Sequence, residues 1–136
     1  MPPCSRFSAC VGRDRRQALA LFRASDFRGA LNAFQALQAK SPDSPYAAAV
    51  QFWIGSAQFA LRDWKAAAAS LQAMLARYPD SPRAPDALLT IASAQLEQND
   101  RRAARATLQS LLDQYPGSSA AETARQRLAS ISANAR

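Results

Sequence analysis

A proline-containing segment recurs along this chain at a fixed interval. Ser-Pro-Asp-Ser-Pro at residues 41–45 returns as Tyr-Pro-Asp-Ser-Pro at 78–82 and as Tyr-Pro-Gly-Ser-Ser at 115–119, an interval of 37 residues. The same offset aligns identical residues at further places: Asp26, Asp63 and Asp100; Ala30, Ala67 and Ala104; Gln35, Gln72 and Gln109. A period of about 20 to 50 residues is typical of stacked supersecondary units that share one core. The sequence therefore predicts a tandem-repeat protein.

Each repeat carries the signals for two helices. In the second repeat, Ser44 followed by Pro45 predicts a helix start, because a serine oxygen caps free N–H groups and proline is tolerated at the first helical position. We expect this helix to end near Leu61 and a second helix to follow, with Asp63 as its N-cap. A proline then stops each second helix: Pro42, Pro79 and Pro116.

Small and apolar residues recur where the two helices of a unit must touch. Gly55 in the first helix faces Ala67 and Leu71 in the second, and Gln58 and Gln95 are expected to hydrogen-bond between helices. The chain is 49% apolar, mostly alanine, which suits closely packed helices. This spacing resembles the tetratricopeptide repeat. The predicted fold class is all-α, a tetratricopeptide-repeat solenoid of three helix pairs with a 37-residue period and a C-terminal capping helix.

The repeats set the expected boundaries. Residues 1–12 are predicted to be an irregular leader, 13–132 the repeat domain and 133–136 a tail. The repeats are expected at about 13–43, 44–80 and 81–117, and the cap helix at 119–131. In the cap, inward positions are predicted for Ala121, Ala124, Leu128 and Ile131, and outward positions for Arg125, Gln126 and Arg127.

Composition excludes several functions. The net charge of +7 raises nucleic acid as a candidate partner, through Arg13, Arg15, Arg16 and Arg23 in the first repeat. The later arginines mostly alternate with acidic residues or sit singly, so solvated helix faces are preferred and no nucleic-acid partner is predicted. Histidine is absent, which removes the commonest general base and metal ligand. No enzyme activity, metal or cofactor is therefore predicted. No run of about 18 apolar residues exists to span a membrane.

The candidate binding surface is the concave side of the solenoid, which the first helices line. It is predicted to consist of Arg15, Leu19, Phe22, Phe52, Trp53, Ser56, Phe59, Leu89, Ser93 and Leu96. Aromatic side chains flanked by arginine are what a peptide-binding hot spot requires. The alternative is that Phe22 and Phe59, which the period aligns, only pack between adjacent repeats. Trp53 has Thr90 at the aligned position of the third repeat, so a purely structural need for it is less evident.

Five stretches carry a closer resemblance: Ser44-Pro45-Tyr46, Phe52-Trp53-Ile54-Gly55, Tyr78 to Ala87, Gln114 to Ala120 and Ala124 to Leu128. From about Arg15 to Ile131 the chain resembles the C-terminal domain of the Tol-Pal system protein family YbgF, also called cell division coordinator CpoB. The resemblance implies a periplasmic adaptor that contacts TolA and links outer-membrane constriction to septal peptidoglycan synthesis by a penicillin-binding protein. Family members carry a signal peptide and a trimerising coiled coil. Neither is visible in this sequence, which a truncated reading frame or an isolated fragment would explain, and the oligomeric state is left open.

A second interpretation within binding proteins is an outer-membrane assembly lipoprotein of the tetratricopeptide type, or another peptide-binding scaffold. Phe7-Ser8-Ala9-Cys10 resembles the end of a lipoprotein signal, which would make Cys10 the acylated residue. Cys4 and Cys10 both lie in the expected leader, so neither is a candidate nucleophile of the repeat core.

Overall fold

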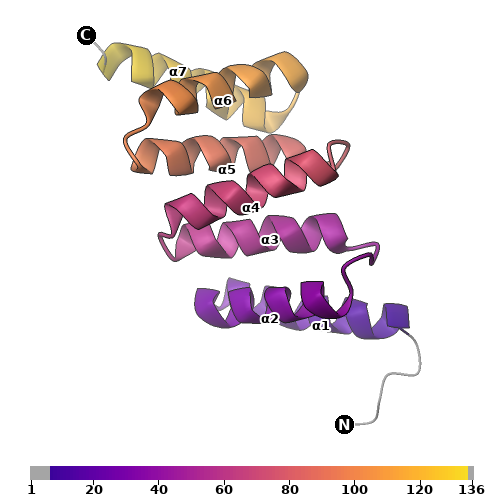
Figure 1. Cartoon of the computed structure of the whole chain (residues 1–136). Coiled ribbons are helices and arrows are strands. Elements are labelled where there is room, and N and C mark those ends of the chain that lie inside the picture. Colours follow the sequence, from indigo (N-terminus) through magenta and orange to yellow (C-terminus); the bar gives the residue numbers. More distant parts are fainter. Residues whose placement is uncertain (1–6, 135–136) are drawn as a thin grey trace.

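The computed structural model describes residues 7–134, which form seven α-helices stacked in sequence order from one end of the molecule to the other (Figure 1). The helices are α1 Phe7–Arg23, α2 Phe27–Lys40, α3 Ala47–Ala60, α4 Trp64–Arg77, α5 Ala84–Glu97, α6 Arg101–Gln114 and α7 Ser119–Asn134. No strand occurs among these described residues. The predicted all-α solenoid of three helix pairs and a cap is confirmed.

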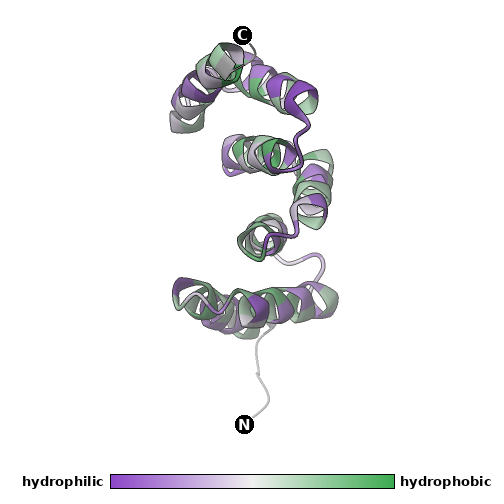
Figure 2. Cartoon of the chain, turned by 90° about the vertical axis from the view of Figure 1, so that its left-hand side faces the viewer, coloured by the Kyte–Doolittle hydropathy of each residue, from purple (hydrophilic) through white to green (hydrophobic). Residues whose placement is uncertain are grey.

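Successive helices pack against each other along the whole stack and run antiparallel (Figure 1), and Figure 2 shows the same stack turned by 90°. The first helices of the second and third repeats also meet, α3 with α5, and α5 meets the cap helix α7. Within residues 7–134, contacts of that extent do not join α2 to α4 or α4 to α6. The first helices α3 and α5 are therefore closer together than the second helices, which places them on the inner side of the solenoid, as expected for this architecture. Among the described residues, contacts of that extent do not join α1 to α3, but the ring of Phe22 on α1 meets that of Trp53 on α3, so α1 borders the same side.

The turn inside each pair is the same in all three repeats. Asp26, Asp63 and Asp100 each accept a hydrogen bond from the backbone N–H three residues on, so the predicted N-caps are confirmed. The residue before each of them has positive φ: Ser25 at 64°, Arg62 at 65° and Asn99 at 62°. A left-handed residue at this point lets the chain reverse between two helices without a longer loop.

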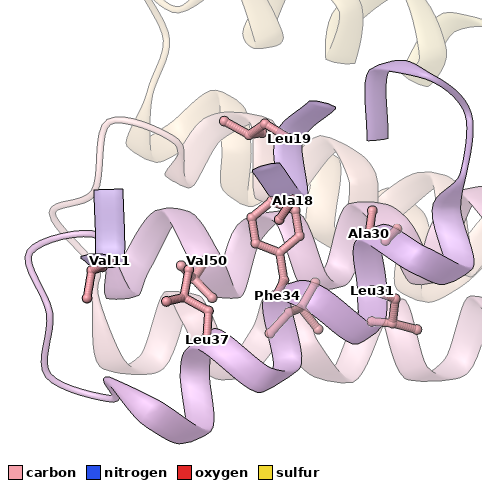
Figure 3. Packing of buried hydrophobic residues seen from close by; sticks show 10 residues of the cluster. Val11, Ala18, Leu19, Ala30, Leu31, Phe34, Leu37 and Val50 are labelled. Atoms are coloured by element: carbon pink, nitrogen blue, oxygen red, sulfur yellow. The ribbon is translucent and has the colours of Figure 1, made fainter. Parts of the chain in front are cut away.

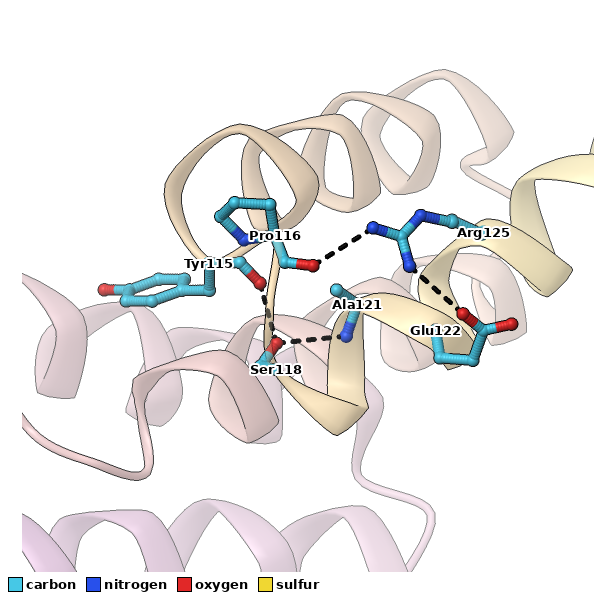
Figure 4. Close-up of polar contacts among 6 residues, drawn as sticks. All are labelled: Tyr115, Pro116, Ser118, Ala121, Glu122 and Arg125. Carbon is cyan, nitrogen blue, oxygen red and sulfur yellow. Dashed lines mark hydrogen bonds and ion pairs between the residues drawn. The ribbon is translucent and has the colours of Figure 1, made fainter.

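The loop between repeats differs from the prediction at its end. The second repeat's first helix begins at Ala47 and not after Ser44, whose Oγ accepts the N–H of Tyr46 at 3.2 Å. The N–H of Ala47 bonds to the carbonyl of Ser44, so a turn precedes the helix. At the aligned position of the last loop, Ser118 does cap a helix, since its Oγ accepts the N–H of Ala121 at 3.1 Å (Figure 4).

The buried core positions recur with the 37-residue period of the sequence. Phe34, Leu71 and Leu108 stand at the aligned position of each second helix, and each has no exposed surface. Figure 3 shows Phe34 and Leu37 of α2 with Val50 of α3 in the first cluster. The predicted close approach at Gly55 is confirmed, because a Cβ there would lie 2.5 Å from the Cγ of Leu71.

Both ends of the repeat domain extend beyond the predicted boundaries. Residues 7–12, expected to be irregular, form the start of α1, while residues 1–6 lie outside the described residues. Val11 explains the extension, because it is 1% exposed and packs in the cluster that contains Phe34 and Leu37. At the other end α7 continues to Asn134, past the expected end at Ile131.

Candidate functional site

The ten residues predicted for the concave surface lie on α1, α3 and α5, but they are not equally available. Leu19 and Phe52 are each 8% exposed and belong to the core. The other eight are half-buried: Arg15, Phe22, Trp53, Ser56, Phe59, Leu89, Ser93 and Leu96. Leu89 and Leu96 pack against the C-terminal cluster of α5, α6 and α7. A partner on the inner side could therefore contact only the exposed parts of side chains that otherwise pack in the core.

Trp53 lies at the centre of an aromatic cluster between the first and second repeats. Its ring centroid is 5.0 Å from that of Phe22, 5.4 Å from that of Phe52 and 6.4 Å from that of Phe34, which stacks on it at 11°. Edge and stacked contacts at such distances stabilise the fold beyond simple area burial. Trp53 thus joins two repeats, and Phe22 packs between repeats as the alternative interpretation stated.

Phe59 has a different environment. Its ring contacts Trp64 at 4.9 Å across the turn between α3 and α4, and no ring contact with Trp53 is found among the described residues. One helical turn before it, Ser56 donates from Oγ to the carbonyl of Phe52 at 3.0 Å. Ser93 makes the same bond to Leu89 in the next repeat. Ser56 and Phe59 thus stand on the inner side apart from the Trp53 cluster.

Two cation–π pairs lie at equivalent places in successive repeats, and the arginine and the aromatic residue have swapped positions between them. The guanidinium of Arg15 lies 4.5 Å from the ring of Tyr46, and that of Arg83 lies 5.2 Å from the ring of Phe52. Phe52 is aligned with Arg15 and Arg83 with Tyr46 by the 37-residue period. Arg83 also covers Trp53 at 5.2 Å. Sequence reasoning missed Tyr46 and Arg83, although reading the period for complementary pairs instead of identical residues would have found them.

Arg127 is a correction to the predicted cap. It was expected on the outer side of α7, but it is half-buried and its Nη1 donates to the hydroxyl of Ser93 on α5. Because α7 packs across α5, a long side chain at this position reaches back to the inner side. Three arginines therefore border the inner surface, Arg15, Arg83 and Arg127, and none of them pairs with a carboxylate among the described side chains.

The middle of this surface is uncharged. No Asp, Glu, Lys or Arg occurs from Pro45 to Leu61, a stretch that includes all of α3. Two buried donors near it, Nε of Arg15 and Nε1 of Trp53, have no hydrogen-bond partner among residues 7–134. We use "inner groove" for Arg15, Trp53, Ser56, Phe59, Arg83, Ser93 and Arg127. It combines an apolar centre with unpaired positive charge at its borders.

The predicted hydrogen bonds of the two glutamines are confirmed, and they are structural. Ser70 donates to Oε1 of Gln58 at 2.6 Å, and Thr107 donates to Oε1 of Gln95 at 2.7 Å, which ties the two helices together in the second and third repeats. Within the described part of the chain, no group of three or more potential ligands is arranged to hold a metal ion. Of the helices described, none has both the length and the apolar character needed to cross a membrane.

Comparisons with family models agree with this geometry. A tetratricopeptide-repeat model matches residues 15–82, and the model of YfiO, described as outer membrane lipoprotein, matches residues 51–129, more than half of the chain. The chain belongs to the YfiO family of tetratricopeptide-repeat proteins. No match is found among curated proteins. The two matching models show a tetratricopeptide-repeat protein, and they do not show the YbgF family that the sequence resembles.

Solved structures show the same fold at low sequence identity. The type III secretion translocator chaperone SycD from Yersinia enterocolitica, in an alternative dimer, matches with a TM-score of 0.77 and 18% identity, over 93% of this chain and 94% of that one. A second SycD structure gives 0.74 and 17%, over 90% of each chain. PcrH in complex with the chaperone binding region of PopB gives 0.75 and 16%, over 95% of this chain and 99% of that one.

Proposed function

We propose that this protein is a non-enzymatic adaptor that binds a segment of a protein partner in its inner groove. The observation that carries this is the uncharged face of α3 bordered by Arg15, Arg83 and Arg127, which have no carboxylate partner among the described side chains. A segment with apolar residues in its centre and acidic residues beside them complements that pattern. An acceptor brought by the segment would also relieve the unpaired donors of Arg15 and Trp53.

The envelope of the cell is the proposed location. The YfiO family description, outer membrane lipoprotein, supports it, and so does the resemblance to the YbgF family. In the finer form of the proposal the partner is TolA, and the protein works in the periplasm with a penicillin-binding protein complex to coordinate constriction and septal peptidoglycan synthesis. PcrH, which has the same fold, was solved with a bound region of PopB, and that supports segment binding as the mode.

A matched pair of charge substitutions tests the groove. Ser56→Glu places a carboxylate on the uncharged inner face, whereas Gln72→Glu places the same charge on the exposed side of α4. We expect Ser56→Glu to weaken binding of purified TolA by about tenfold or more in titration calorimetry, because desolvating an unpaired charge costs more than about 1.4 kcal/mol. Gln72→Glu should bind like the unsubstituted protein. Equal binding by both variants, with circular dichroism unchanged, would exclude the inner groove.

The second candidate is an outer-membrane assembly lipoprotein, which the YfiO match favours. An anchor at Cys10 is not part of it, because Cys10 lies within α1 and is 7% exposed. Photo-crosslinking in cells from a photoreactive residue at Phe59 separates the two candidates. Products with TolA or a penicillin-binding protein support the Tol-Pal role. Products with outer-membrane assembly proteins and none with TolA would replace it with the second candidate.

A further inference from the structure

A cavity of about 130 Å³ lies away from the inner groove, between α2, α3 and α4. It is next to the helix ends that the proline loops connect. Its walls include Ser41 and Pro42 of the first loop, Val50 and Gln51 of α3, and Arg77 and Tyr78 at the end of α4. None of these residues belongs to the surface assigned above to partner binding. We call this space the loop cavity.

The repeat explains why the space is there. Ser41 is aligned with Tyr78 and Tyr115 by the 37-residue period, so the first repeat has serine where the others have tyrosine. Tyr78 packs against the core cluster that contains Ala87, which is aligned with Val50 in the wall of the cavity. A tyrosine at position 41 would occupy the corresponding place beside Val50. The loop cavity therefore stands where the other repeats hold a phenol ring.

The third tyrosine shows what such a ring does in this setting. Tyr115 packs against the C-terminal cluster, and its hydroxyl donates to the carbonyl of Pro79 at 3.2 Å. Pro79 is aligned with Pro42, which lines the loop cavity. In this fold, then, a phenol is held by apolar contact around the ring and by a polar partner for its hydroxyl.

The walls of the loop cavity are more polar than the same place in the next repeat. Gln38 donates to Gln51, which in turn donates from Nε2 to the carbonyl of Ser70 at 2.8 Å. The aligned residues of the next repeat are Leu75 and Leu88. Ser41 is 3% exposed, and its Oγ is a buried polar atom without a partner in the part of the chain that the structure describes. Such an atom costs free energy unless a ligand or water satisfies it.

We propose that the loop cavity is a docking site for the aromatic side chain of a protein partner, with tyrosine preferred to phenylalanine. The size supports a single ring, since an engineered cavity of about 150 Å³ in another protein binds benzene. The preference for tyrosine comes from the unpartnered Oγ of Ser41 and from Gln38 and Gln51, which can exchange hydrogen bonds with a phenol hydroxyl. The site does not depend on the inner groove or on its partner.

The first experiment uses the tyrosine side chain itself as probe. Titrating p-cresol into the ¹⁵N-labelled protein should give saturable NMR shifts at the amides of Ser41, Ala47, Gln51 and Tyr78. Toluene should produce the same pattern at an affinity severalfold weaker, because it leaves the polar walls unsatisfied. If neither probe shifted these amides, the cavity would not admit an aromatic ring, and that result would overturn the proposal. Shifts confined to α1, α3 and α5 residues of the inner groove would overturn it as well.

Variants and peptides complete the test. Ser41→Tyr fills the cavity from within and should abolish the p-cresol shifts, while Ser130→Tyr adds the same ring on the exposed side of α7 and should leave them intact. Ser41→Ala keeps the space and should remove most of the preference for p-cresol over toluene, which gives a result even if Ser41→Tyr does not fold. The peptide Gly-Gly-Tyr-Gly-Gly should shift the same amides. Binding of free p-cresol without the peptide would refute a partner side chain in favour of a small phenolic compound.

Discussion

In the second repeat, Trp53 and Gly55 occupy the positions that Thr90 and Ala92 occupy in the third. Trp53 touches three aromatic rings and Gly55 brings α3 directly against Leu71. In the third repeat, Thr90 only donates to a backbone carbonyl of its own helix. The repeats share one architecture, but large aromatic rings fill the junction between the first and second repeats, and smaller residues stand at the aligned positions of the third.

What the two repeats share is as informative as what separates them. Both keep the bond from the second helix to a glutamine of the first, and both keep the aspartate cap of the second helix. In a solenoid, stability is roughly a sum of repeat and junction contributions. The shared bonds then set the geometry of a helix pair, and the differing residues set how firmly each pair is held to its neighbour.

The largest expected effect is at Trp53. Trp53→Ala should lower the free energy of unfolding by about 3 kcal/mol, because it removes the ring that joins Phe22, Phe34 and Phe52. Thr90→Ala at the aligned position should cost about 0.5 kcal/mol or less, since its hydroxyl only bonds within its helix. Urea unfolding followed by circular dichroism measures both. Similar losses in the two variants would show that the junctions are equally strong and that the aromatic cluster is not special.

Substitution of Gly55 is expected to have an intermediate effect on stability, opposite in sign to what helix propensity alone predicts. Alanine is the better helix former by about 1 kcal/mol, yet Gly55→Ala should destabilise the protein by about 1 kcal/mol, because the new Cβ would lie 2.5 Å from the Cγ of Leu71. The reverse change in the third repeat, Ala92→Gly, should also destabilise it by about 1 to 2 kcal/mol, through lost helix propensity and a lost buried methyl group. Differential scanning calorimetry of both variants measures this. A gain in stability for Gly55→Ala would show that α3 and α4 are not pressed together at this point.

Periodicity carried most of the sequence prediction of the fold. Aspartate caps, the turn between helices and the buried positions all follow from local chemistry that repeats every 37 residues, so three aligned copies reinforced each weak signal. The starts of α1 and α3 could not be read in the same way. Val11 makes α1 begin early through a tertiary contact, and the turn after Ser44 depends on how the loop packs.

The candidate site was less predictable because it depends on side chains from different repeats. The sequence could place Trp53 on the inner side, but its contacts with Phe22 and Phe34 arise only once two repeats are stacked. The exchange of ring and guanidinium between Arg15–Tyr46 and Phe52–Arg83 is likewise a property of the junctions. A search for identical residues cannot find such pairs, since the interaction is kept while the residues are not.

The smallest expected effect on stability is at the turn inside each helix pair, where Arg62 in the second repeat is aligned with Asn99 in the third. Both have positive φ, at 65° and 62°, a conformation that costs an ordinary residue about 1 to 2 kcal/mol and that asparagine tolerates better. Arg62→Gly should therefore raise the free energy of unfolding by about 0.5 to 1 kcal/mol after the entropic cost of glycine, whereas Asn99→Gly should change it by less than about 0.5 kcal/mol. Paired urea titrations resolve a difference of this size when the slopes agree. If the two glycine variants were equally stabilised, the strain would be a property of the shared turn and not of arginine, and the turns of the second and third repeats would be equivalent.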